Sequence, residues 1–123
     1  MGQKILIVDD DSLTPRLFQR HLEKTGYQML AAANGREAVE VAERELPHLI
    51  VMDIMMSEMD GLTALKQLKK IEATKNIPVI VISANAHPMA KQEAETAGAA
   101  VFLTKPFSPS QLLAEIQRLI PEA

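Results

Sequence analysis

The stretch that decides the fold is Ile5–Asp10, Ile-Leu-Ile-Val-Asp-Asp, in which four aliphatic residues run directly into two aspartates. Three later stretches repeat this arrangement of an apolar run that ends in polar residues: Leu49–Asp53, Val79–Ser83 and Val101–Lys105. Short apolar runs that alternate with helical patterns are typical of parallel strands buried on both faces. In such sheets the working crevice lies beyond the carboxyl ends of the strands. We therefore expect the polar residues at these four strand ends to meet in one pocket.

The composition is that of an ordinary globular protein and excludes several classes of function. The 123 residues are 47% hydrophobic and 24% charged, with no cysteine and a net charge of −3. Without cysteine there is no disulfide framework, thiolate nucleophile or cysteine-based zinc site. The lysines and arginines are scattered, which gives no electrostatic footprint for nucleic acid. No apolar stretch approaches the roughly 20 residues that span a bilayer, and no secretory signal is present. We expect a cytoplasmic protein without direct nucleic-acid or membrane contact.

Strands and helices alternate regularly along the rest of the sequence. A weaker strand over Gln28–Ala32 has a thin, alanine-rich pattern that is typical of a sheet edge. Each of the five expected strands is followed by a helical pattern, and the crossovers in such βα units are right-handed. The sequence therefore predicts an α/β fold, a three-layer α/β/α sandwich around a parallel five-stranded sheet. We expect one domain spanning residues 1–123.

Two of the expected helices differ in how much apolar surface they offer to the core. The second helix begins at Asn34, which resembles the cap of a capping box. Its apolar face is expected to consist of four residues: Ala38, Val39, Ala42 and Leu46. The fourth helix, closed by Gly98, offers mainly Met89 and alanines. Because it buries little apolar area, we expect it to be the least firmly packed helix.

Five polar residues at the strand ends supply compatible chemistry. Clustered carboxylates such as Asp9, Asp10 and Asp53 cost free energy unless a cation neutralises them. Oxygen ligands beside solvent suit Mg²⁺, which takes a few carboxylates and keeps several waters. Asp53 can attack phosphorus as a carboxylate nucleophile and form an aspartyl phosphate. Lys105 supplies positive charge for the phosphoryl oxygens, and the Ser83 hydroxyl can donate a hydrogen bond to them.

Each of these residues, taken alone, also has an ordinary structural interpretation. Ser83 would be a strand-end hydroxyl bonded to backbone, and Lys105 a solvated surface charge. Acidic residues at a helix start are favoured by the helix dipole, and for Asp11, beside Ser12, we accept that interpretation. For the other residues we reject it, because they recur at matching strand ends. The histidines are too dispersed for a metal site: His21, His48 and His87.

In their order and spacing, these motifs resemble the receiver domain of two-component response regulators over essentially the entire chain. The matching stretches are Ile5–Asp10, Asp53, Met59–Gly61, Ser83–Ala84 and Lys105–Phe107. The resemblance implies a flavodoxin-like parallel sheet in the strand order 2-1-3-4-5. It implies a phosphoacceptor in a phosphorelay, which is not an enzyme beyond its own phosphorylation and dephosphorylation.

The resemblance also assigns roles to the acidic residues. Asp53 matches the phosphoacceptor. Asp10 and Asp53 match direct Mg²⁺ ligands, whereas Asp9 would act mainly through water and the backbone carbonyl of Met55 would complete the protein's share. The sequence departs from the family at Ser57, where proline is usual in the loop after the acceptor.

The remaining matches concern the switch and its partners. Ser83 and Lys105 match the hydroxyl and the lysine that contact the phosphoryl group. Phe102 falls at the aromatic switch position, where it replaces the common tyrosine and lacks its hydroxyl. The resemblance implies a sensor histidine kinase or phosphotransfer protein as donor. The surface of helix 4, strand 5 and helix 5 would then bind an effector or form a homodimer.

Three other functions deserve comparison with this interpretation. A flavodoxin-like cofactor-binding module shares the fold, but three aspartates after the first strand would repel a phosphate. A phosphatase of the haloacid dehalogenase kind usually needs a general acid two residues after the nucleophile, where Met55 stands. A receiver that no longer takes phosphate is disfavoured because all five site positions are filled. No effector domain follows Ala123, so we expect either a stand-alone receiver or one excised from a larger protein.

Overall fold

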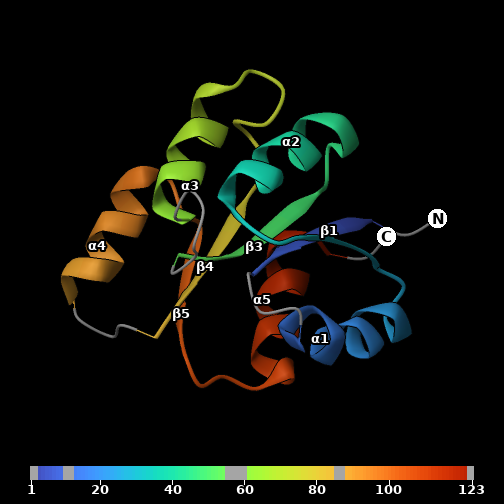
Figure 1. The fold of residues 1–123 in the computed structure, drawn as a ribbon. Helices are drawn as coiled ribbons and strands as arrows, with labels where there is room; N and C mark the ends of the chain where they lie inside the picture. The colour runs from blue at the N-terminus through green and yellow to red at the C-terminus, as the bar shows by residue number, and fades with distance from the viewer. Residues whose placement is uncertain (1–2, 10–12, 55–60, 85–87, 122–123) are drawn as a thin grey trace.

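A computed structural model of the protein describes residues 3–9, 13–54, 61–84 and 88–121, with only the backbone at 13–15 and 17. Within these ranges a parallel sheet runs in the order β2-β1-β3-β4-β5, which confirms the expected topology (Figure 1). The elements are β1 (Lys4–Val8), α1 (Leu13–Lys24), β2 (Gln28–Ala32), α2 (Gly35–Glu45), β3 (Leu49–Asp53), α3 (Gly61–Lys70), β4 (Val79–Ser83), α4 (Pro88–Ala97), β5 (Val101–Thr104) and α5 (Pro109–Leu119).

The sheet is the middle of three layers, because successive side chains of a strand point to opposite faces. On one face Leu6 and Val81 belong to a cluster that includes buried residues of α2, α3 and α4. On the other face Ile5 and Ile80 belong to a cluster that includes buried residues of α1 and α5. Figure 1 shows the same division of the helices between the two faces. The predicted three-layer sandwich is therefore confirmed.

The central strands are buried along their length, whereas the edge strands are not. Every residue of β3 and β4 is buried, and in β1 only Lys4 is partly exposed. The outer strands β2 and β5 are largely half-buried or exposed. This contrast confirms Gln28–Ala32 as an edge strand. It also explains why the central strands consist of continuous aliphatic runs.

The apolar face expected for the second helix is correct except at Leu46. Ala38, Val39 and Ala42 are buried. Leu46 is the C-cap of α2, with φ 47°, and its side chain is 50% exposed. Its backbone N–H still donates to the carbonyl of Ala42. The left-handed conformation ends the helix one position before the apolar pattern does, so Leu46 leaves the face that its spacing predicts.

The fourth helix is thinly packed, as expected. Ala94 is the buried residue of α4 among those described, and Met89 near its start is 62% exposed. Gly98 follows the helix with φ 113°, a conformation that favours glycine. A helix held mainly by one buried methyl group can shift at low cost.

Candidate functional site

The carboxyl ends of the strands bring four of the predicted site residues to one edge of the sheet. Asp53 ends β3 and is paired in register with Ile82 of β4. Ser83 ends β4 and is paired with Thr104 of β5, directly before Lys105. Asp9 follows β1, whose last residue is paired with β3. Parallel pairing therefore places Asp9, Asp53, Ser83 and Lys105 at adjacent strand ends.

Lys105 joins the two described aspartates of this edge. Its Nζ lies 2.6 Å from Oδ2 of Asp53 and 3.9 Å from Oδ2 of Asp9. Both carboxylates are buried, whereas 37% of the lysine side chain remains exposed. Two buried carboxylates would repel each other without a cation, and the ammonium group compensates them. The lysine thus occupies the position from which it can also meet negative charge added to Asp53.

Backbone hydrogen bonds fix the chain on both sides of the site. The N–H of Lys105 donates to the carbonyl of Ser83 at 2.9 Å, which holds the lysine against the end of β4. The N–H of Asp9 donates to the carbonyl of Ala32 at 3.1 Å, which continues the β1–β2 pairing past the last strand residue. The site side chains therefore extend from anchored backbone, as preorganised charge stabilisation requires.

Gly61 is a site-supporting residue to which the sequence alone assigned no role. Its N–H donates to the carbonyl of Ile54 at 3.2 Å. A Cβ at this position would lie 2.6 Å from the carbonyl oxygen of Asp53 and 2.6 Å from Cα of Ile54. Since both atoms belong to backbone, they cannot yield as a flexible side chain would. The signal in the sequence was the glycine that begins a helix eight residues after Asp53, but only the folded chain shows what it approaches.

Ser83 and Phe102, the two residues expected to form a switch, lie on the neighbouring strands β4 and β5. Ser83 is fully buried at the end of β4. Phe102, in the neighbouring strand β5, is partly buried and packs against the core cluster on the face of α2, α3 and α4. Phe102 is paired with Val81, two residues before Ser83. The aromatic ring thus belongs to the strand next to the serine, on the side of the thinly packed α4.

The donor set of this edge fits a hard divalent cation. The described part consists of the carboxylates of Asp9 and Asp53, both oxygen ligands, in a setting that already demands positive charge. Asp10 and Met55, the other expected ligands, lie outside the described residues. Among the described residues alone, no group of three or more candidate ligand side chains gathers.

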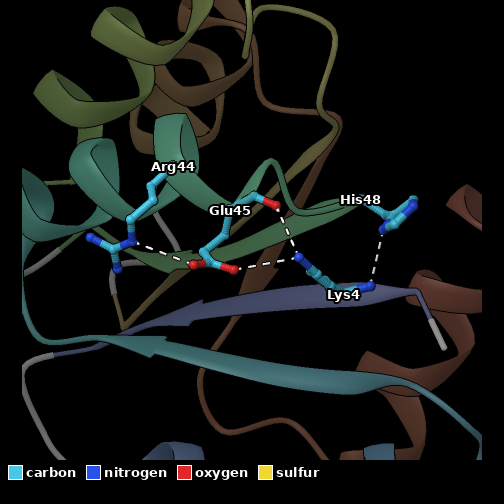
Figure 2. A network of polar contacts seen from close by, with 4 residues as sticks. All are labelled: Lys4, Arg44, Glu45 and His48. Atoms are coloured by element: carbon cyan, nitrogen blue, oxygen red, sulfur yellow. Dashed lines mark hydrogen bonds and ion pairs between the residues drawn. The ribbon is translucent and has the colours of Figure 1, made fainter. Parts of the chain in front are cut away.

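A second polar cluster lies at the opposite end of the sheet, where β1 and β3 begin. Figure 2 shows Lys4 between Glu45 and His48. Lys4 Nζ lies 3.4 Å from Oε1 and from the backbone oxygen of Glu45, and the backbone N–H of Lys4 donates to Nδ1 of His48 at 3.0 Å. The hydrogen bond from Lys4, supported by Arg44, holds the pKa of Glu45 below its usual value. These contacts, partly buried at Lys4 and Glu45, join the end of α2 to the start of the sheet, which is a structural role.

The chain is similar to known proteins in both sequence and structure. The sequence profile described as "Response regulator receiver domain" matches residues 5–117. The chain belongs to this family. It is 40% identical over 121 residues to the chemotaxis protein CheY of Bacillus subtilis, covering 98% of this chain and 99% of CheY. Receiver domains of this kind are signalling modules rather than conventional enzymes.

Two further relatives show the range of proteins that contain this receiver domain. The chain is 36% identical over 120 residues to PhoP, the alkaline phosphatase synthesis transcriptional regulatory protein of Bacillus subtilis. The match covers 98% of this chain but only 49% of PhoP. It also resembles the solved receiver domain of the sensor histidine kinase PA1611 from Pseudomonas aeruginosa, with a TM-score of 0.89, 31% identity and coverage of 99% and 100%. That structure is described with a magnesium ion coordinated in its active-site cleft. These comparisons do not favour a flavodoxin-like cofactor module.

Described residues include no helix with the length and apolar character that crossing a membrane requires.

Proposed function

We propose that this receiver domain accepts a phosphoryl group on Asp53. In this reaction an Asp53 carboxylate oxygen attacks phosphorus, and the bond from phosphorus to the donor's leaving group breaks. The observation that carries the proposal is the 2.6 Å contact between Lys105 Nζ and Asp53 Oδ2. A lysine at this distance can follow the charge as it moves from the carboxylate to the phosphoryl oxygens. The chain acts on its own aspartate, so the proposed chemistry comprises self-phosphorylation and the later loss of the phosphoryl group.

The proposed site includes Mg²⁺, for which Asp53 and Asp10 would supply carboxylate oxygens and Met55 its backbone carbonyl. Asp9 would act mainly through water. When bound, the ion neutralises negative charge on the transferred group and helps to orient it. Asp9 and Asp53 support this assignment because both are buried acids at neighbouring strand ends. The chain's own contribution is to hold these oxygens in place through the backbone contacts of Asp9 and Gly61.

The proposed donor is a sensor histidine kinase or a phosphotransfer protein that carries phosphohistidine. Transfer breaks the bond between phosphorus and one imidazole nitrogen, the bonding electrons stay on that nitrogen, and a proton on the other ring nitrogen lets the histidine leave as a neutral imidazole. Small donors such as acetyl phosphate can serve as well, because the receiver itself supplies Lys105 and the proposed metal site. With such kinases as donors, the proposed location of this reaction is the cytoplasm.

The proposed consequence is a change of the surface formed by α4, β5 and α5. New phosphoryl oxygens would draw the hydroxyl of Ser83 toward Asp53, and the loop after β4 would follow. Phe102 could then bury more of its half-buried ring, and full burial of such a side chain is worth about 1.5–3 kcal/mol. This magnitude matches the few kcal/mol that separate two populated states. A downstream effector or a second copy of the chain would bind this surface.

Intact-mass measurement tests the acceptor. Incubation with acetyl phosphate and Mg²⁺ should add the mass of one phosphoryl group to the parent protein, and Asp53→Asn should abolish the addition. Glu45→Gln serves as the matched control, since it removes a carboxylate at the other end of the sheet and should leave the addition intact. Labelling that persists in Asp53→Asn would place the acceptor on another residue.

Amide hydrogen exchange with and without beryllofluoride, a phosphoryl mimic, tests the switch. Exchange should change most in α4, β5 and the start of α5, and Ser83→Ala should reduce that change while the mimic still binds. Changes confined to α1 and α2, or a response that Ser83→Ala leaves intact, would refute the proposed coupling.

A further inference from the structure

A groove lies between α3 and α4, on the face of the sheet that these helices cover. In Figure 1 the two helices run side by side, α3 in green and α4 in orange. The groove has a volume of about 530 Å³, and each of its walls is a row of residues from one helix. On α3 the row extends from Leu62 to Lys70, and on α4 from Met89 to Ala97. None of the groove residues belongs to the site at the strand ends.

The lining combines apolar surface with exposed methionine. Leu62 and Ala97 are partly buried, and Met89 at the end of the groove is 62% exposed. Met89 is one of two large hydrophobic residues that are exposed in the described chain. Methionine adapts its shape to different partners and is frequent on surfaces that bind helical peptides. The lining therefore includes apolar surface from both helices, with Met89 as its most exposed large hydrophobic side chain.

The charge of the groove is opposite to that of the whole chain. The chain carries a net charge of −3, whereas three lysines and one glutamate line the groove: Lys66, Lys69, Lys70 and Glu93. The ammonium group of Lys69 donates to the backbone oxygens of Lys75 and Ile77, at 3.2 and 2.8 Å. Lys69 therefore contributes mainly its aliphatic stem to the groove. Lys66 and Lys70 are exposed, and neither forms an ion pair with another described residue. Among the described residues, the lining of the groove therefore carries more positive than negative charge, with Glu93 as its acidic residue.

The length of the groove fits a short helix. Each wall spans eight residue steps, and a rise of 1.5 Å per residue makes this about 12 Å, or two helical turns. A third helix laid between two others places apolar residues at i and i+4, or at i and i+3, along its buried side. Its remaining side would then face the rim, where Lys66 and Lys70 favour carboxylates.

We infer that the α3–α4 groove binds an amphipathic, acidic helical segment of a partner protein, with apolar anchors on Leu62 and Met89 and carboxylates toward Lys66 and Lys70. This inference goes beyond the proposed phosphoryl transfer and does not require it. The groove contains neither Asp53 nor Lys105, so the unphosphorylatable Asp53→Asn protein is also expected to bind. Binding that fails while phosphorylation succeeds would remove this inference alone.

Selection from a displayed library of random peptides of about 12 residues, enough for three turns of helix, tests the inference. The parent protein is the target, and the enriched peptides are then measured individually by fluorescence anisotropy. We expect enriched sequences with two apolar residues three or four positions apart and an excess of aspartate and glutamate. Lys66→Glu combined with Lys70→Glu should weaken these peptides by at least about tenfold, and Met89→Asp should weaken them as well.

A double charge reversal outside the groove is the matched control. Lys75, paired with Glu72, and Lys91, on α4, are exposed and do not line the groove. Lys75→Glu combined with Lys91→Glu should change the affinity by less than about threefold. Circular dichroism of all variants establishes that they are folded, which is expected for exposed positions.

Three results would overturn the inference. Either no peptides are enriched above the starting library, or the enriched peptides are basic, or they bind equally well to the Lys66→Glu, Lys70→Glu protein. Sedimentation of the parent protein tests a second copy of the chain as the occupant. If the parent protein is a dimer and the groove variants are monomers, the occupant of the groove is a second copy of this chain rather than a partner protein.

Discussion

The rings of Phe18 and Phe107 are stacked, with centroids 5.6 Å apart and planes within 1° of parallel. Phe18 belongs to α1, and Phe107 follows Lys105 by two residues. Both rings join the core cluster on the face of α1 and α5. The contact therefore ties the segment that carries the site lysine to a helix formed almost ninety residues earlier in the chain.

The stacking of Phe18 on Phe107 should stabilise the protein by more than the burial of the two rings accounts for. The double variant should therefore lose less stability than the sum of the two single variants. Aromatic pairs contribute about 0.5–1.5 kcal/mol beyond the area that they bury. A double-mutant cycle of Phe18→Leu and Phe107→Leu, measured by urea unfolding, should give a coupling energy in this range. Leucine keeps the site apolar, so the cycle isolates the ring contact. Additive effects of the two substitutions would mean that the stacking itself contributes nothing to stability.

Gly61→Ala should damage both stability and the site. The added methyl group would lie 2.6 Å from the backbone oxygen of Asp53, so the chain at the acceptor must shift. Forcing extra carbon into packed surroundings costs about 1–3 kcal/mol. We expect a loss of that size in the free energy of unfolding, together with slower phosphorylation by acetyl phosphate.

Gly98→Ala is the control for this substitution. Gly98 has φ 113°, and its added Cβ would lie 2.9 Å from Cγ of Lys69, so it should also be destabilising. Its position after α4 is far along the chain from Asp53, and it touches no site residue. If both variants lose stability but only Gly61→Ala loses phosphorylation rate, the effect belongs to the approach to Asp53. Equal losses of rate would show that stability alone accounts for them.

The site residues on strand ends were predictable because parallel topology leaves them no other place. Once apolar runs predict buried parallel strands, the residues after those runs must share one edge, and Asp53 and Lys105 do so. The fold class was predictable as well, because the length and apolar character of each strand can be read from a short stretch of sequence. The family resemblance added the strand order, which spacing alone does not give.

The features that the sequence did not predict depend on backbone conformation or on contacts that only the folded chain creates. Leu46 continues the apolar spacing of α2, but a left-handed cap ends the helix there. Gly61 is a helix start in the sequence, and its approach to Asp53 exists only in the folded chain. The three lysines of the α3–α4 groove lie close together on α3, but the wall opposite them comes from α4, nearly thirty residues later, so the groove exists only in the folded chain. The first case depends on a local backbone conformation, and the other two require knowledge of which segments become neighbours.

Lys69 should make stability depend on pH in the alkaline range. Partial burial lowers the pKa of Lys69 below its usual value of 10.5. The unfolded chain therefore binds a proton more tightly at this position than the folded protein does. The resulting penalty is fully present below the folded-state pKa and disappears as pH rises through the range up to 10.5. This contribution to stability consequently increases with pH.

Urea unfolding of the parent and of Lys69→Met at several pH values between neutrality and 10.5 measures this contribution. The parent should gain stability relative to the variant as pH rises, because methionine keeps the apolar stem but carries no proton. At neutral pH the variant also loses the hydrogen bonds to Lys75 and Ile77. The pH dependence of the difference, rather than its size, is therefore the test. A constant difference would show that burial does not affect the protonation of Lys69.

Lys105 should weaken Mg²⁺ binding, although the lysine and the ion both compensate the negative charge of Asp9 and Asp53. Its ammonium group lies beside Asp53 and near Asp9, so in the proposed magnesium site it repels the incoming ion. Lys105→Met should leave the two buried carboxylates short of positive charge and lower the stability of the metal-free protein by about 1–3 kcal/mol, less than for a fully buried pair because the lysine is partly exposed. The same substitution should tighten Mg²⁺ binding by roughly three- to tenfold.

Calorimetric titration with Mg²⁺ separates this electrostatic effect from a loss of the site. Lys105→Met should bind more tightly than the parent, whereas Asp53→Asn should bind more weakly, because one variant removes repulsion and the other a ligand. Lys75→Met, at an exposed lysine paired with Glu72, should match the parent. The phosphorylation rate of Lys105→Met should nevertheless fall, since the lysine that follows charge onto the phosphoryl group is gone. Tighter Mg²⁺ binding together with slower phosphoryl transfer in Lys105→Met is the result expected of a lysine within the site. An unchanged Mg²⁺ affinity in this variant would place the ion away from Lys105.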